Sequence, residues 1–111
     1  MMAVDPDLVD RMEAALIARG ASPVRRKMFG GITLMVNGNM SYGTSGEEMH
    51  VRVGPERHAE ALARPGARAM DFTGRPMKGW VTVDGPADLS DEEIGSWADL
   101  SLAFNRTLPA K

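Results

Sequence analysis

The sequence feature that most constrains the fold is a hairpin signal, Asn37-Gly38-Asn39, set between two stretches that favour strands. An Asn-Gly pair suits the tight turns of β-hairpins, because both residues tolerate positive φ. The residues before it, Met28–Val36, are apolar, β-branched or glycine, and Met40–Thr44 follows as the return strand. This part of the chain therefore predicts an antiparallel pair of strands rather than a helix.

A third strand is predicted over residues 48–53, where apolar and polar residues alternate after a second turn. We expect Met49 on a buried face and His50 on a face that is open to water. Residues 26–53 are thus predicted to form a three-stranded antiparallel meander. Paired glycines weaken a strand, so Gly30-Gly31 is expected to mark a bulge or a close approach of another element.

Three helices are predicted around these strands. The first has Asp5-Pro6 as N-cap and first helical residue, and Gly20 stops it. A short second helix is expected to open with Gly54-Pro55 and to end at Arg64-Pro65-Gly66. The third begins with the capping box Ser90-Asp91-Glu92-Glu93.

Two more strands are predicted between the second and third helices, the clearer one over Trp80–Val83. The expected order is α-β-β-β-α-β-β-α. Neighbouring strands without regular helical crossovers favour an antiparallel sheet. The predicted fold class is therefore α+β, in two layers, with helices packed on an antiparallel sheet.

Length and composition limit the classes of protein to consider. A chain of 111 residues suits a single domain, residues 1–111. It has no cysteine, which excludes disulfides, thiolate metal sites and cysteine nucleophiles. We see neither a signal peptide at the N-terminus nor an apolar run near the roughly 20 residues of a membrane span. We therefore expect a soluble, cytoplasmic protein that has no membrane partner.

No catalytic or cofactor-binding pattern is visible. The only histidines, His50 and His58, are both expected at the surface, and no Gly-x-Ser-x-Gly elbow accompanies them. Gly30-Gly31 lacks the residues of a phosphate loop or a dinucleotide fingerprint. Glu47, Glu48 and His50 alternate in direction, so they are not expected to converge on a metal. The sequence thus predicts a protein that is not an enzyme and has no metal and no cofactor.

Four short motifs together carry a family resemblance. They are Arg26-Lys27-Met28-Phe29-Gly30-Gly31, Asn37-Gly38-Asn39-Met40, Val51-Arg52-Val53-Gly54 and Gly74-Arg75-Pro76-Met77-Lys78-Gly79-Trp80. The chain resembles the TfoX N-terminal domain family (the TfoX/Sxy group) over roughly residues 8–108. The resemblance implies a two-layer α+β fold and a relation to bacterial regulators of natural competence. The resemblance implies no catalytic residues. Longer members of the family carry a second, helical C-terminal domain. The resemblance to the N-terminal domain takes up nearly all of the 111 residues, so we expect a stand-alone N-terminal domain.

The net charge of −2 hides a basic middle, because residues 25–80 hold nine basic and five acidic side chains, a local charge of +4. Such a segment could contact nucleic acid, since phosphate contacts need clustered cations. The candidate basic patch consists of Arg25, Arg26, Lys27, Arg52, Arg75 and Lys78. Nucleic-acid binding ranks second, because the chain is acidic overall and has few aromatic residues for stacking.

A regulatory or protein-interaction module ranks first. Three short helices are not expected to cover both faces of the sheet, and an open face or edge suits a protein partner or self-association as a homodimer. Methionines gather in the predicted strands, where they could fill the core or line a binding surface. The candidate interaction surface consists of Arg26, Met28, Phe29, Arg52, Met77 and Trp80.

Overall fold

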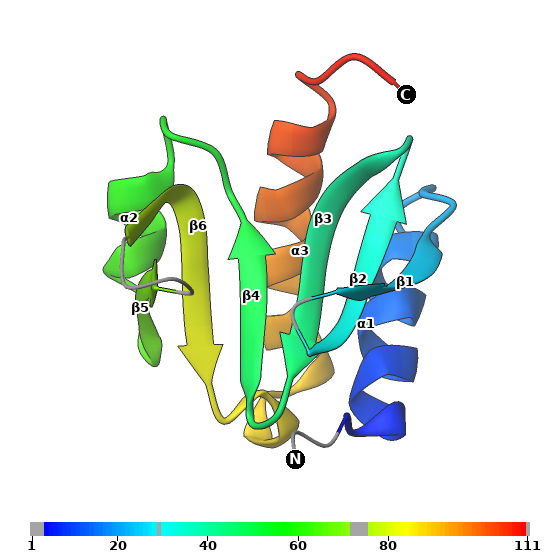
Figure 1. Cartoon of the computed structure of the whole chain (residues 1–111), viewed down its shortest axis with the longest axis horizontal. Helices are drawn as coiled ribbons and strands as arrows, with labels where there is room; N and C mark the ends of the chain where they lie inside the picture. The colour runs from blue at the N-terminus through cyan, green and yellow to red at the C-terminus, as the bar shows by residue number, and fades with distance from the viewer. Residues whose placement is uncertain (1–3, 29, 72–75, 111) are drawn as a thin grey trace.

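The computed structural model describes residues 4–28, 30–71 and 76–110, without the side chains of 71, 76 and 77 (Figure 1). The helices in this part of the chain are α1 (Pro6–Ile17), α2 (His58–Leu62), the short 3-10 helix η1 (Pro86–Asp88) and α3 (Asp91–Asn105). The strands are β1 (Val24–Met28), β2 (Gly31–Val36), β3 (Asn39–Ser45), β4 (Glu48–Arg52), β5 (Ala67–Asp71) and β6 (Pro76–Asp84). All neighbouring strands are antiparallel, in the order β1-β2-β3-β4-β6-β5. The predicted α+β class is confirmed, and the helices and strands follow the predicted order with one additional strand before α2.

The described helices α1, α2 and α3 pack on one face of the sheet (Figure 1). The Tyr42 hydroxyl of β3 donates a hydrogen bond to the Met12 carbonyl of α1 over 2.5 Å. Arg64, just after α2, donates to the Ser96 hydroxyl of α3 over 2.7 Å, so the short helix lies beside α3. The opposite face, which we call the helix-free face, receives none of these described helices.

Local signals set the helix starts. The Asp5 carboxylate accepts hydrogen bonds from the first turn of α1, and Pro6 is the first helical residue. Ser90 and Glu93 form both hydrogen bonds of the capping box of α3. The predicted start of the second helix was wrong, because α2 begins at His58 and not at Pro55. The Gly54 amide donates to the Gly79 carbonyl, which ties this stretch to β6 before the helix starts.

The predicted meander contains an additional strand. Val24–Met28 pairs with Gly31–Val36 as the separate outer strand β1, because the chain reverses at the paired glycines, where Gly30 has φ 72°. Gly31 also lies against β3, since a Cβ on it would stand 2.0 Å from the Thr44 carbonyl oxygen. The close approach that was expected at this pair is therefore present.

The core lies between the sheet and the helices. Its largest side chains include Leu34, Tyr42, Met49, Ile94 and Trp97, all buried. Further methionines are buried as well, namely Met12, Met35 and Met70. The described methionines of the strands therefore serve mainly as core residues, with Met28 and Met40 half-buried.

Candidate interaction surface

The outer strand β1 is the most exposed strand of the sheet. Val24, Arg25, Arg26 and Lys27 are all exposed, and Val24 retains 59% of its accessible surface. Among the described residues, Val24 and Ile17 are the exposed large hydrophobic side chains. β1 ends the strand order, so one of its backbone edges has no described strand beside it. Figure 1 shows this strand on the α1 side of the molecule.

Arg25 is bound to the helix layer. Its guanidinium donates to the Glu13 carboxylate over 3.0 Å and to the Asp10 carboxylate over 2.7 Å, and both acids lie on α1. Hydrogen bonds to Glu13 first and Asp10 second raise the pKa of Arg25 above its ordinary value. The charge of Arg25 is thus largely balanced within the protein, and its side chain fixes β1 against α1.

Arg26 and Lys27 extend from β1 on opposite sides. Side chains alternate along a strand, so Lys27 lies on the same side as Arg25, and Arg26 lies on the helix-free face. Both side chains are exposed. Neither has an ion-pair partner within the described ranges 4–28, 30–71 and 76–110. β1 therefore presents one exposed cation on each side of the sheet, and no described residue forms an ion pair with either.

Arg52 belongs to a separate cluster. Its guanidinium carbon lies 5.2 Å from the centroid of the Phe104 ring of α3 and 6.0 Å from that of Trp80. Trp80 is the cross-strand partner of Arg52 and is buried. Contacts of this kind contribute about 0.5–1 kcal/mol at exposed sites and more when desolvated. Arg52 therefore joins the end of α3 to the sheet.

The two candidate residue sets are each divided by the fold. In the interaction set, Arg26 and Met28 lie on β1, whereas Arg52 and Trp80 lie on β4 and β6, at least three strand positions away. At about 4.8 Å per strand, that separation is roughly 14 Å. Phe29 lies outside the described residues, and the side chain of Met77 is not described.

The candidate basic patch is also dispersed. Arg25 and Lys27 lie on the helix side of the sheet and Arg26 lies on the helix-free face, whereas Arg52, at the end of β4, reaches the Phe104 ring of α3. Lys78 is exposed on β6, and Arg75 lies outside the described residues. Two of the six cations already have partners. Arg25 pairs with Asp10 and Glu13, and Arg52 lies over the Trp80 and Phe104 rings. The exposed cations without a described ion pair include the adjacent pair on β1.

His50 is not a surface residue, so that prediction was wrong. It lies on the helix-free face, as its place in the alternation predicted, but only 6% of it is exposed. Its Nε2 lies 2.9 Å from the Ser45 hydroxyl, and its Nδ1 lies 3.1 Å from the Thr82 hydroxyl. Burial lowers the pKa of His50, a shift that Glu48 opposes and Arg68 reinforces.

The described cross-strand neighbours of His50 are small or polar. The registers align a row of residues across the helix-free face: Arg26, Thr33, Gly43, His50, Thr82 and Arg68. Gly43 opposite the ring has no side chain, and β2 lies so close that a Cβ there would stand 2.6 Å from the Ile32 carbonyl oxygen. The other predicted surface histidine, His58, is half-buried, with its Nε2 3.1 Å from the Trp80 carbonyl oxygen. The middle of this face is a packed polar layer rather than an open apolar surface.

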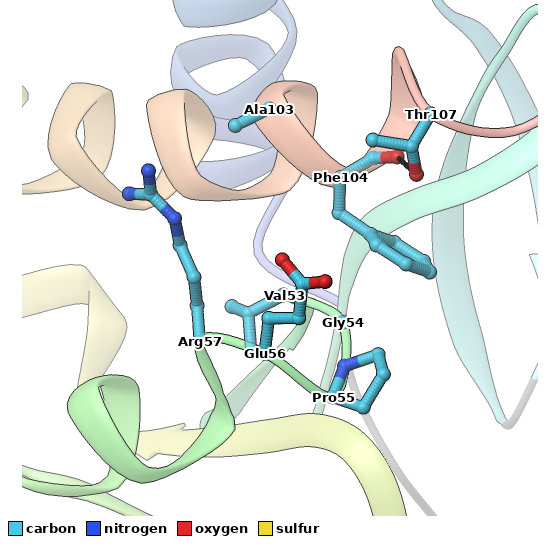
Figure 2. Close-up of a pocket in the computed structure, with 8 residues that line it drawn as sticks. All are labelled: Val53, Gly54, Pro55, Glu56, Arg57, Ala103, Phe104 and Thr107. Atoms are coloured by element: carbon cyan, nitrogen blue, oxygen red, sulfur yellow. Dashed lines mark hydrogen bonds between the residues drawn. The ribbon is translucent and has the colours of Figure 1, made fainter.

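A groove of about 320 Å³ lies between the segment that follows β4 and the end of α3. Figure 2 shows Glu56 and Arg57 reaching from that segment toward α3, and the Phe104 ring reaching back from the helix. Gly54 makes this contact possible, because a Cβ on it would lie 2.2 Å from a ring carbon of Phe104. Nothing in the sequence indicates this groove, because its two sides are about fifty residues apart in the chain.

Two further properties of the molecule bear on what it can bind. The residues that the structure describes contain no group of three or more His, Asp or Glu side chains placed to hold a metal ion. Among the described helices, none combines the length and the apolar character needed to cross a bilayer.

Comparison with known proteins identifies the family. No curated protein matched the chain. The family described as the TfoX N-terminal domain matches residues 15–105, which span α1 from Ala15 to the last residue of α3. That range covers most of the 111 residues and every strand of the sheet. The chain therefore belongs to the TfoX N-terminal domain family.

Proposed function

We propose that this protein is a non-enzymatic regulatory module that acts by binding another protein through the outer strand β1. The family relation supports the regulatory part of this proposal, because the family takes its name from regulators of competence. The exposed edge of β1 is the observation that supports the binding part. An exposed strand edge offers a row of backbone donors and acceptors that a second chain can pair with.

β1 suits this role better than the edge at the other end of the sheet. Its pairing with β2 is regular at all five positions, from Val24 to Met28. The other edge strand, β5, has a register shift between Ala69 and Asp71, and α2 packs beside it. Bulges and covering elements are common protections of an edge against another strand. Of the two edges, β1 is the one that combines a regular register with exposed side chains at its first four positions.

Nucleic-acid binding remains the second candidate function. Arg26, Lys27 and Lys78 are exposed and could contact phosphates. Arg25 and Arg52 fit this function less well, because carboxylates hold the first and aromatic rings hold the second. The protein-binding role is therefore preferred.

Site-specific crosslinking in the cell tests the proposal. A photo-crosslinking amino acid replaces Val24 on β1 in one variant, and replaces Glu92 on the exposed first turn of α3 in the control. We expect a defined adduct with another polypeptide from position 24 that is missing from position 92. Adducts of equal yield at both positions, or crosslinks to nucleic acid alone, would contradict the proposal.

A further inference from the structure

We propose that the partner of β1 is an extended segment with two consecutive acidic residues, which adds to the sheet as a seventh, antiparallel strand. This inference rests on the proposed function and specifies the chemistry of the partner. It combines three observations: the regular outer strand, the exposed cations on its two sides, for which the described residues offer no ion pair, and the exposed Val24 at its start.

The two cations set the charge and spacing of the partner segment. On an added strand, the residue opposite Arg26 lies on the helix-free face, and the residue opposite Lys27 lies on the helix side. Opposite charges that face each other across neighbouring strands stabilise the pair. Because Arg26 and Lys27 are adjacent in sequence, their acidic partners must also be adjacent and must point to opposite sides.

The neighbouring positions define the rest of the segment. Arg25 is already held by Asp10 and Glu13, so the residue opposite it need not be charged. Val24 is 59% exposed, and a β-branched residue opposite it would remove apolar surface from water. Because the added strand runs antiparallel to β1, its first residue faces Met28 and its last residue faces Val24. A matching core segment is therefore Thr-Glu-Glu-Thr-Val.

A second copy of this protein is a poor partner for the same edge. In an antiparallel β1–β1 pair centred on Arg26, Arg26 faces its own copy, and Arg25 faces Lys27. Every one of these positions sets like charges opposite each other, which destabilises strand pairing. In this register the basic residues of β1 repel each other, whereas they attract an acidic segment.

A fluorescence-polarisation titration tests this inference with the full 111-residue chain. The probe is a labelled peptide with the core Thr-Glu-Glu-Thr-Val. One control peptide has lysine in place of both glutamates, and another has N-methyl groups on alternate backbone amides, which removes strand hydrogen bonds and keeps the charge. The matched variants are Arg26→Glu and Lys78→Glu, which make the same change of charge at two exposed sites, on β1 and on β6.

We expect saturable binding of the acidic peptide and at least tenfold weaker binding of both control peptides. Arg26→Glu should weaken binding by about fivefold or more, because it replaces an attraction with a repulsion, and Lys78→Glu should leave it within about twofold. Equal binding of the N-methylated peptide would overturn strand addition. Equal losses from the two charge reversals would overturn the β1 site. Binding of labelled duplex DNA that Arg26→Glu abolishes, with no binding of the acidic peptide, would assign the edge to nucleic acid.

The two proposals can fail separately. If the peptide does not bind but position 24 still crosslinks to a protein, the acidic-segment inference falls and the protein-binding function stands. If neither the peptide binds nor the crosslink forms, both fall.

Discussion

The imidazole of His50 and the hydroxyl of Ser45 lie 2.9 Å apart in a buried layer on the face of the sheet that the described helices leave free. Thr82 lies on the other side of the ring and contacts its second nitrogen. The three residues belong to three successive strands of the sheet, β3, β4 and β6. This layer joins the strands through side chains as well as through the backbone ladder.

The stability of the protein should therefore fall as pH falls below about 6.5, the ordinary pKa of histidine. Above that pH, His50 is neutral in both the folded and the unfolded chain, and the stability is complete. Below it, the unfolded chain binds a proton that the buried ring resists, because burial lowers its pKa in the fold while Glu48 and Arg68 act in opposite directions.

Urea denaturation of the native protein and of His50→Gln at pH 7.5, 6.5 and 5.5 measures this effect. Glutamine keeps hydrogen-bonding capacity but does not titrate, and His58 is present in both proteins. The native protein should lose stability relative to the variant as the pH falls. Parallel curves for the two proteins would show that His50 does not cause the pH dependence.

Replacing Arg52 should lower stability without touching the proposed binding edge. Arg52→Ala removes the contacts of the guanidinium with the Phe104 and Trp80 rings, so we expect a loss of about 1 kcal/mol in the free energy of unfolding. Arg26→Ala is the matched control, because Arg26 is exposed and has no ion pair among the described residues. It should change the free energy by less than about 0.5 kcal/mol. Similar losses in both variants would contradict a structural role for the Arg52 cluster.

Asn105 connects the end of α3 to the end of β2, since its Nδ2 donates to the Val36 carbonyl over 3.0 Å. The side chain is buried, so Asn105→Ala should cost about 1–3 kcal/mol in the free energy of unfolding. Asn105→Asp should cost more, because it removes the donor and adds a buried carboxylate. Denaturant midpoints of the two variants give the comparison. If Asn105→Asp were as stable as the native protein at neutral pH, the buried hydrogen bond from Asn105 to Val36 would not stabilise the fold.

Gly31 cannot accept a side chain, because a Cβ would lie 2.0 Å from the backbone oxygen of Thr44. Gly31→Ala should therefore separate β2 from β3 and cost about 3 kcal/mol or more. Gly20→Ala is the control: it has φ +84° but nothing within 4 Å of the added carbon, so it should cost only about 1–2 kcal/mol. Thermal unfolding by circular dichroism would rank the two variants. An equal loss for both would mean that backbone conformation, rather than the close approach of β3, decides the effect.

Contacts between residues close in sequence could be predicted from the sequence. Asp5 and Ser90 cap their helices through hydrogen bonds that reach at most three residues along the chain. Asn37 and Gly38 both adopt positive φ in the hairpin turn, as the residue types indicated. The family resemblance was likewise visible in short motifs, and the family match confirms it.

Only the tertiary structure decided which polar side chains are exposed to a partner. Arg25 and Arg26 look alike in the sequence, but Arg25 meets Glu13 and Asp10 on another element, and Arg26 lies on the opposite side of the strand. His50 is buried and lies within hydrogen-bond distance of Thr82, thirty-two positions away on another strand. Alternation along a strand predicts the side to which a residue points, whereas its exposure depends on neighbours that the chain brings together only when it folds. The sequence by itself therefore determined the fold class and the family of this protein, and the packing of distant segments decided which of its basic residues can meet a partner.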